Sequence, residues 1–364
     1  MLKFLSWILL IGIFVFIAGY VVNRFVESTV SEPITATENY RNGKFYNTAP
    51  RDRPGFTKMI GVMKRWFTEK KTDPEPTKPL PLLSVTREQL GALSNDELHL
   101  VKLGHSSLLL KMYGEYWLID PVFADRASPF SFIGPKRFQS TPIRIQDLPP
   151  IAKVLISHNH YDHLDKAAIE ALASKTQQFL VPQGVEGDLQ KWGVDREKIT
   201  RFSWWQELKT DKALLAFTPT QHFSGRGFSD GNKTLWGSWV IKTAKESLYF
   251  SGDSGYFDGF KTIGEKYGPF DLTMLENGAY NSDWADIHML PEEAVQAHVD
   301  LKGVAMMPVH NSTFDLSFHP WYEPLDRVSA EAEKREVKLI TPLVGEVFTA
   351  KQPPTSKQWW LDSK

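Results

Sequence analysis

The sequence predicts an α/β protein in which layered sheets are flanked by helices, with a single membrane-spanning helix in front of them. Three observations support this prediction. From about residue 97, short apolar runs alternate with turn residues, a pattern typical of strands. Fewer segments with helical spacing lie between these runs, and this mixture favours packed sheet layers over a barrel with strict strand–helix alternation. Residues 4–22, FLSWILLIGIFVFIAGYVV, carry no charge.

Length and composition narrow the classes of protein. With 364 residues, the chain has room for one large domain or two average ones. The formal net charge of −1 gives no support to a nucleic-acid partner. The chain contains no cysteine, which excludes disulfides, thiolate ligands and a cysteine nucleophile. Any bound metal must therefore be held by imidazole and carboxylate groups.

The apolar stretch 4–22 is the predicted membrane anchor. At about 1.5 Å per residue, a helix of its 19 residues is close to the roughly 30 Å thickness of a hydrocarbon core. The alternative is a cleaved signal peptide, but the apolar region of such a peptide usually has about 7–15 residues, and no clear small-x-small cleavage site follows here. We therefore expect residues 1–24 to be an uncleaved single-pass membrane anchor. Basic residues on both flanks leave the side of the remaining chain open.

Residues 25–90 contain an amphipathic segment and a proline-rich segment. Residues 56–67, FTKMIGVMKRWF, place apolar side chains at helical spacing, with the lysines off that stripe. This pattern predicts a helix that either docks on the main domain or lies in the headgroup layer of a membrane. Residues 73–83, DPEPTKPLPLL, contain four prolines and are expected to form a linker or an extended wrap over the surface.

The main domain is expected to span residues 91–350, followed by a C-terminal tail at 351–364. Predicted strands lie at 98–103, 107–112, 115–119, 153–156, 179–182, 213–217, 235–242, 247–250, 271–275, 304–308 and 345–349. Predicted helices lie at about 164–174, 184–192, 257–267, 291–301 and 324–336.

The stretch SHNHYDHLD, residues 157–165, holds three of the ten histidines of the chain. It follows an apolar run, so the cluster is expected on a loop after a buried strand, where sites are commonly built. His158 and His160 can point from one loop toward one metal ion, while Asp162 and His163 turn toward a second ion a few ångströms away. Solvated or core histidines at chance spacing are the structural alternative.

Two metal ions need more ligands than this loop supplies. His222, Asp253 and His310 each follow an apolar run by one to three positions, as the cluster itself does. Strand ends at one edge of a sheet converge, so we expect these residues to complete the site. Neutral imidazoles bind zinc well, and a carboxylate such as that of Asp253 can bridge two ions.

The order His-x-His-x-Asp-His, His, Asp, His resembles the metallo-β-lactamase superfamily. The flanking sequence is similar to the zinc-dependent N-acyl-phosphatidylethanolamine-hydrolysing phospholipase D family, in a bacterial form. Beyond the cluster, the similar stretches are YRNGKFYNTAP (40–50), DPVFADRASPFSFIGPKRF (120–138), FTPTQHFS (217–224), LWGSWV (235–240), GDSGY (252–256), IGEKYGPFDL (263–272), GAY (278–280) and PEEAVQAH (291–298). The resemblance covers roughly residues 40–345. It implies a four-layer αβ/βα sandwich with two zinc ions at the edge where the sheets meet.

The resemblance also implies roles for single residues. The ligands that it implies are His158, His160 and His222 for one zinc ion, Asp162, His163 and His310 for the other, and Asp253 as the bridge. His288, in DIHMLPEEAV, matches a histidine that the family places near the substrate phosphate. Tyr161 lies within the matching cluster, and we expect it at the substrate. Glu276 stands where the animal enzymes have an apolar residue, and we expect it near the substrate as well.

Asp162, Asp253 and His288 are the residues expected to act in catalysis. His288 is the candidate proton donor or phosphate contact, and a helix cap or surface histidine is the alternative. His105, in VKLGHSSLLL, and Asp120, in DPVFAD, are expected to lie behind the ligands and to orient them. Plain packing is the alternative for His105.

Three hypotheses for function follow. Two ions about 3.5–4 Å apart that share a water lower its pKa toward 7 and deliver hydroxide to a phosphodiester or to a carbonyl carbon, so the ligands alone do not select the substrate. The first hypothesis is a membrane-anchored, zinc-dependent phosphodiesterase of the phospholipase D type, acting on N-acyl-phosphatidylethanolamine or a related phospholipid. The second is a metal-dependent lactonase or another small-molecule hydrolase of the superfamily. The third is a non-enzymatic binding module, against which the complete ligand set argues. The expected partner is a phospholipid or membrane surface, and a homodimer is compatible with the sequence.

Overall fold

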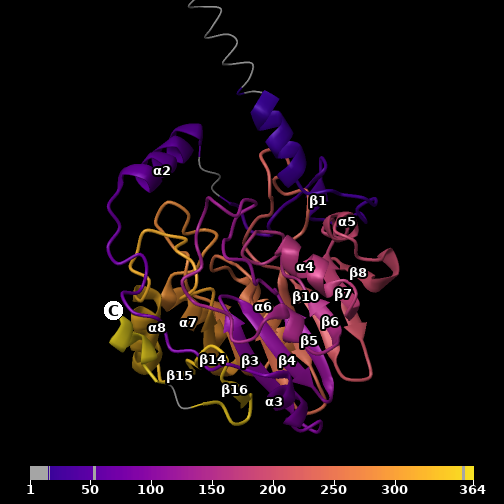
Figure 1. Ribbon diagram of the computed structural model, residues 1–364, viewed down its shortest axis with the longest axis vertical. Helices are drawn as coiled ribbons and strands as arrows, with labels where there is room; N and C mark the ends of the chain where they lie inside the picture. Colours follow the sequence, from indigo (N-terminus) through magenta and orange to yellow (C-terminus); the bar gives the residue numbers. More distant parts are fainter. Residues whose placement is uncertain (1–14, 16, 52–54, 355–356) are drawn as a thin grey trace, which may run out of the picture.

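The computed structural model describes residues 15, 17–51, 55–354 and 357–364, and it contains two seven-stranded sheets (Figure 1). The first sheet has the strand order β16-β3-β4-β5-β6-β7-β8. Its strands are β3 (Leu98–Gly104), β4 (Ser107–Met112), β5 (Glu115–Ile119), β6 (Ile151–Leu155), β7 (Thr176–Pro182), β8 (Ile199–Phe202) and β16 (Val347–Thr349). The second sheet has the order β15-β14-β13-β12-β11-β10-β9. Its strands are β9 (Glu207–Lys209), β10 (Leu214–Thr218), β11 (Ser238–Lys242), β12 (Ser247–Phe250), β13 (Phe270–Glu276), β14 (Gly303–Val309) and β15 (Lys338–Leu339).

The helices and the smaller elements complete the chain. The helices are α2 (Phe56–Thr68), α3 (Arg87–Ala92), α4 (Lys166–Leu172), α5 (Glu186–Lys191), α6 (Gly259–Tyr267), α7 (Pro291–Asp300) and α8 (Glu323–Lys334). Short 3-10 helices are η1 (Ile145–Asp147), η2 (Arg196–Lys198) and η3 (Trp359–Ser363). A separate two-stranded sheet is formed by β1 (Tyr40–Arg41) and β2 (Lys44–Phe45).

Three apolar clusters show that sheets and helices form four layers. One cluster lies between the two sheets and joins Leu110 and Leu155 of the first sheet to Phe217 and Met274 of the second. Another packs α3, α4 and α5 against the outer face of the first sheet. The third packs α6, α7 and α8 against the outer face of the second sheet. The order helix, sheet, sheet, helix confirms the predicted αβ/βα sandwich.

The directions of the strands explain where a site can form. Strands β5 to β8 run parallel in the first sheet, and β12 to β15 run parallel in the second. Each strand from β3 to β5 pairs antiparallel with the next one, and so does each strand from β9 to β12. Carboxyl ends of parallel strands share one edge of a sheet, and the loops that leave this edge can bring distant residues together.

Most predicted elements are present, with ends shifted by up to three residues. Strand β7 begins three residues before the predicted segment 179–182, and β11 begins three residues after the start of the predicted segment 235–242. The amides of Leu235 and Gly237 donate instead to the carbonyls of Gln183 and Ser157, which follow β7 and β6 of the other sheet. This segment therefore ties the two sheets together before the strand begins.

The short strands β8, β9 and β15 and the helix α3 were not expected from the sequence pattern. Each of these three strands lies at the end of the strand order of its sheet. An edge strand needs little apolar surface, and β9 and β15 are largely exposed, with the sequences ELK and KL. The apolar alternation that reveals inner strands is therefore missing from them.

The N-terminal apolar stretch is described only in part. Residues 1–14 and 16 lie outside the described residues, and with them most of the predicted anchor at 4–22. Residues 17–26 are helical and project from the main body (Figure 1). Among the described residues, no helix combines the length and the apolar character needed to cross a membrane. The anchor stays a prediction.

The segments before the first long strand lie against the sandwich. Helix α2 covers the predicted amphipathic range, and its Arg65 forms an ion pair with Asp283 of the main body. The proline-rich segment 73–83 is an extended wrap, because the amide of Leu83 donates to the carbonyl of Val344 at 2.9 Å. Leu82 also forms an isolated bridge with Val344.

Candidate metal centre

The histidine-rich loop connects β6 to α4. It turns where the amides of His163 and Leu164 donate to the carbonyl of His160, at 3.0 and 2.8 Å. Asp165 then caps α4, because its side chain accepts a hydrogen bond of 2.9 Å from the backbone of the first helical turn. The strand end and the helix cap fix both ends of the loop, so its side chains are held in place.

The other predicted ligands arrive from three separate loops. His222, Asp253 and His310 follow β10, β12 and β14, and all three are buried. The backbone φ of His310 is 63°, and the φ values of His105 and Asp120 are 49° and 41°. Positive φ costs a residue other than glycine about 1–3 kcal/mol, and such conformations cluster at functional sites. The structure brings all seven predicted ligands together.

These seven side chains and His105 form two adjoining groups, in each of which the potential ligand atoms lie within 4.8 Å of one another. The groups are His158, His160, His222 and Asp253, and His105, Asp162, His163 and His310. The carboxylate of Asp253 touches both groups. Its oxygens lie 3.0 Å from Nε2 of His163, 3.1 Å from Nε2 of His310 and 3.7 Å from Nε2 of His158. This arrangement would suit two ions, one at each group, because Asp253 contacts both groups.

The potential ligand atoms of the cluster are of the kinds that bind divalent metal ions. Nε2 of His163 and Oδ1 of Asp253 are buried and face each other at 3.0 Å, but neither forms a hydrogen bond with a described residue. Buried polar atoms are normally satisfied, so such atoms need a partner of another kind. Nε2 of His158 faces Nδ1 of His160 at 2.9 Å. Imidazole nitrogens and carboxylate oxygens are ligands that zinc and similar ions accept.

The electrostatics favour the metal-binding forms of four predicted ligands, which are His158, His160, His222 and Asp253. Burial alone would lower the pKa of His163 and His310, but the carboxylates of Asp253 and Asp162 outweigh burial and raise the pKa of both histidines. Burial lowers the pKa of His158 and His222 well below the ordinary value of histidine, and it lowers the pKa of His160 to about 4. Neutral imidazole is the form that binds metal. Burial raises the pKa of Asp253, but His163 and His310 outweigh burial and hold this pKa well below its usual range.

Hydrogen bonds behind the cluster orient its rings. Oδ2 of Asp120 lies 2.7 Å from Nδ1 of His163, and Oδ1 of Asp120 accepts a hydrogen bond of 2.7 Å from the amide of Ser157. Nδ1 of His222 contacts the carbonyl of Ile287 at 3.0 Å. A ring that donates backward through Nδ1 presents Nε2 to the metal.

His105 lies beside the predicted ligands and is itself a potential ligand. Its Nε2 lies 3.0 Å from Oδ2 of Asp162, and its ring centre is 4.1 Å from that of His310. His105 and Asp120 therefore contact the predicted ligands Asp162 and His163, as we expected from the sequence. His105 also belongs to the group of potential ligands around Asp162.

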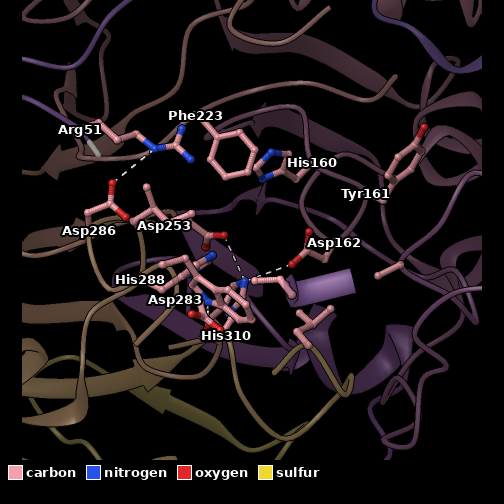
Figure 2. A pocket seen from close by; sticks show the side chains of 16 residues that line it. Arg51, His160, Tyr161, Asp162, Phe223, Asp253, Asp283, Asp286, His288 and His310 are labelled. Atoms are coloured by element: carbon pink, nitrogen blue, oxygen red, sulfur yellow. Dashed lines mark hydrogen bonds and ion pairs between the residues drawn. The ribbon is translucent and has the colours of Figure 1, made fainter. Parts of the chain in front are cut away.

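A cavity of about 540 Å³ opens over the cluster (Figure 2). Its lining combines polar groups of the cluster with an apolar wall. The apolar wall contains Val62, Phe223, Trp284, Ile287 and Leu316. At one side of the cavity, Nε of Arg51 lies 3.5 Å from Asp286, and the guanidinium lies 4.5 Å from the ring centre of Phe223.

The residues expected near the substrate take different positions. His288 and Tyr161 both line the cavity. The hydroxyl of Tyr161 donates to the carbonyl of Arg226 at 2.9 Å, and the guanidinium of Arg226 lies 4.0 Å from the ring centre. Glu276 is fully buried, does not line the cavity and contacts Nδ1 of His288. The expected contact of Glu276 with substrate is therefore replaced by a contact with His288, because the side chain at the end of β13 points inward.

Several residues that line the cavity were not expected from the sequence. Val62, Trp284 and Leu316 come from segments far apart in the chain, and no spacing pattern connects them. Arg51 had a weak signal, because it directly follows the stretch 40–50 that resembles the phospholipase D family.

A two-sheet αβ/βα sandwich with a histidine and aspartate cluster at the strand ends defines a hydrolase of the metallo-β-lactamase type. Comparison with known families agrees with this class. Residues 116–311 match the family described as Beta-lactamase superfamily domain, and the chain belongs to this family. The protein is a metal-dependent hydrolase of the metallo-β-lactamase superfamily.

Relatives cover most of the chain. An uncharacterized protein of Mycobacterium tuberculosis is 40% identical over 327 residues, which are 88% of this chain and 87% of that protein. The N-acyl-phosphatidylethanolamine-hydrolyzing phospholipase D 1 of Caenorhabditis elegans is 32% identical over 353 residues, with 88% of this chain and 98% of the relative covered. A metallo hydrolase of the archaeon Ignicoccus hospitalis has a similar structure, with a TM-score of 0.54 and 21% identity over 69% of this chain and 97% of that one. This last similarity concerns the fold.

Proposed function

We propose that the protein is a phosphodiesterase of the phospholipase D type that uses two zinc ions to hydrolyse N-acyl-phosphatidylethanolamine or a related phospholipid. The observation that carries this proposal is the cavity, in which Asp253 and His310 of the cluster share a lining with the apolar side chains of Val62 and Trp284. A phospholipid needs both surfaces, because its phosphate must reach the metals while its acyl chains avoid water. The C. elegans relative, named for this reaction, supports the same substrate class.

The groups of the chain divide the chemistry among them. Bound divalent ions supply a nucleophilic water near neutral pH and polarise the phosphate. The seven proposed ligands would hold those ions, and Asp253 lies in contact with the ligands of both positions. His288 lines the same cavity, so its free ring nitrogen can take up a proton from water, and the ring can then donate this proton to the ethanolamine oxygen as the bond between this oxygen and phosphorus breaks. The products are an N-acylethanolamine and phosphatidic acid.

Helix α2 supports the proposal that the substrate is a membrane lipid. Its Val62 lines the cavity, while Ile60 and Met63 remain 44% and 55% exposed. Lys58 and Lys64 on the same helix are also exposed. An amphipathic helix with exposed apolar and basic side chains suits the headgroup layer of an anionic membrane. We propose that α2 rests on the membrane and that the cavity opens toward it.

The test uses the purified full chain, loaded with zinc, and vesicles that contain N-acyl-phosphatidylethanolamine. We expect equal amounts of N-acylethanolamine and phosphatidic acid by mass spectrometry, loss of both products with a chelator, and recovery with zinc. The variant Asp253→Asn should be inactive, whereas Asp195→Asn, at an exposed position far from the cluster in sequence, should keep full activity. A zinc-loaded enzyme that forms neither product would contradict the proposal.

A lactone assay distinguishes the alternative small-molecule hydrolase. The ligand set serves a carbonyl carbon as well as a phosphorus atom, so only turnover separates the two. We expect the lipid to be hydrolysed far faster than acyl lactones by the same preparation. Rapid lactone hydrolysis without any lipid product would replace the phospholipase proposal with the lactonase.

A further inference from the structure

We propose that Glu276 is a positioning residue that holds His288 in one orientation and in one tautomer at the edge of the metal cluster. The inference rests on the proposed function only in one respect, which is the role of His288 in transferring a proton to the leaving oxygen. The pair itself is a property of this chain, since Glu276 and His288 meet through their side chains.

Glu276 is rigidly held from several sides. It is the last residue of β13, it is paired with Val309 of β14, and its side chain is 0% exposed. Oε1 contacts Nδ1 of His288, and Oε2 accepts a hydrogen bond of 2.9 Å from the amide of Ser254. The amide of Glu276 donates to Oγ of Ser251 at 2.9 Å. Both carboxylate oxygens are therefore engaged, and the side chain has little freedom to move.

The contact with Glu276 determines which nitrogen of His288 carries a proton. A carboxylate only accepts hydrogen bonds, so Nδ1 of His288 must be the donor. Nε2 is then the nitrogen that Glu276 leaves available. Figure 2 shows the His288 side chain close to those of Asp253 and His310. One potential ligand atom from each of these three residues lies within 4.8 Å of the others.

The position of His288 explains why a fixed orientation and a fixed tautomer of its ring matter. The rings of His222 and His310 lie 5.1 and 5.6 Å from its ring, centre to centre. The His288 side chain is 12% exposed and lines the cavity, so it meets both the ligands and the substrate space. Without Glu276, the ring could rotate or exchange tautomers, and Nε2 would face the leaving oxygen for only part of the time.

The variants Glu276→Gln and Glu276→Ala test the pair in the full, zinc-loaded chain. Nitrogen NMR of histidine-labelled protein reports the tautomer, and the signal lost in His288→Asn identifies His288. We expect a single Nδ1–H tautomer in the wild type and a mixture in Glu276→Ala. The zinc content should stay unchanged in both variants. Glu293→Gln is the matched control, because Oε2 of Glu293 accepts a hydrogen bond from Leu290 nearby in the chain.

Kinetics give the second readout. In Glu276→Ala we expect kcat for the lipid to fall roughly 10- to 100-fold with KM nearly unchanged, as is usual for a partner behind a reacting group. Glu276→Gln retains an acceptor oxygen and should recover part of the loss. A wild-type tautomer pattern in Glu276→Ala would overturn the proposal, and so would a loss of activity that follows zinc content alone. If no lipid is hydrolysed at all, the NMR result still decides the role of Glu276, so the two proposals fail separately.

Discussion

Asp120 and His163 form a buried contact of 2.7 Å between Oδ2 and Nδ1, directly behind the metal cluster. Both side chains are 0% exposed. The contact directs Nε2 of His163 toward Asp253, at 3.0 Å from its Oδ1. Because the ring is held from behind, the orientation of a proposed ligand exists before any ion binds.

The first prediction concerns Asp120→Asn. The asparagine side chain has one acceptor oxygen and one donor NH2 group. Its oxygen can accept a hydrogen bond from His163 or from the backbone N–H of Ser157, and the other of these two donors would then face the NH2 group. We expect roughly 10- to 100-fold weaker zinc binding, measured by competition with a coloured chelator. Asp147→Asn is the control, because Asp147 pairs with Arg144 at the surface. Equal affinities in the two variants would show that Asp120 does not support the ligand.

The second prediction concerns removal of the metal. Two proposed ligand atoms, Nε2 of His163 and Oδ1 of Asp253, are buried and face each other at 3.0 Å, and neither forms a hydrogen bond with a described residue. Metal that binds only the folded chain stabilises it by about 4 kcal/mol when free metal exceeds Kd a thousandfold. We therefore expect chelator to shift urea unfolding to lower concentration and zinc to restore it. An unchanged midpoint would contradict metal binding at the cluster.

The ligand positions could be predicted from sequence because each one follows a readable signal. Apolar runs revealed β6, β10, β12 and β14, and a polar side chain such as His222 or Asp253 follows each run. Parallel strands then bring such ends to one edge. The four-layer order came from the mixture of strands and helices together with the family resemblance, and the apolar clusters on both faces of each sheet explain it.

The cavity could not be predicted in the same way. Val62 and Trp284 share a wall only because α2 and a loop after β13 meet in the folded chain. The pairing of Glu276 with His288 depends on the direction of a single side chain at the end of β13. Neither relationship repeats with a period, so a pattern along the chain carries no information about them.

The third prediction concerns pH and His298. This residue of α7 is 3% exposed, and its Nδ1 lies 2.7 Å from Oγ1 of Thr273. Burial, with a smaller effect of Arg335, lowers the pKa of His298 to about 4, while an unfolded histidine titrates near 6.5. Between these values the unfolded chain binds more protons, so the folded state loses stability as pH falls.

The variant His298→Gln isolates this effect. We expect wild type to lose about 2 kcal/mol more unfolding free energy than His298→Gln between pH 7.5 and pH 5. Urea unfolding at both pH values measures it, and the histidines of the metal cluster titrate equally in both proteins and cancel. Parallel pH profiles of the two proteins would refute the prediction.

The last prediction concerns the exposed face of α2. In the double variant Ile60→Ser with Met63→Ser, the helix keeps its cavity side but loses apolar surface that would enter a membrane. We expect a several-fold lower rate on N-acyl-phosphatidylethanolamine in anionic vesicles and an unchanged rate on a short-chain analogue dispersed as monomers. Added salt should reduce the vesicle rate of the wild type as well, because Lys58 and Lys64 are exposed on the same helix.

Val304→Ser provides the matched control for this double variant. Val304 is 59% exposed and lies near the start of β14, whereas the cluster lies after the end of this strand. The control should therefore keep both rates. Equal losses on vesicles and on monomeric analogue in the α2 variant would indicate damage to the cavity rather than lost membrane contact. Full vesicle activity in that variant would remove α2 from the membrane interface, because its exposed apolar side chains would then serve no purpose in reaching the lipid.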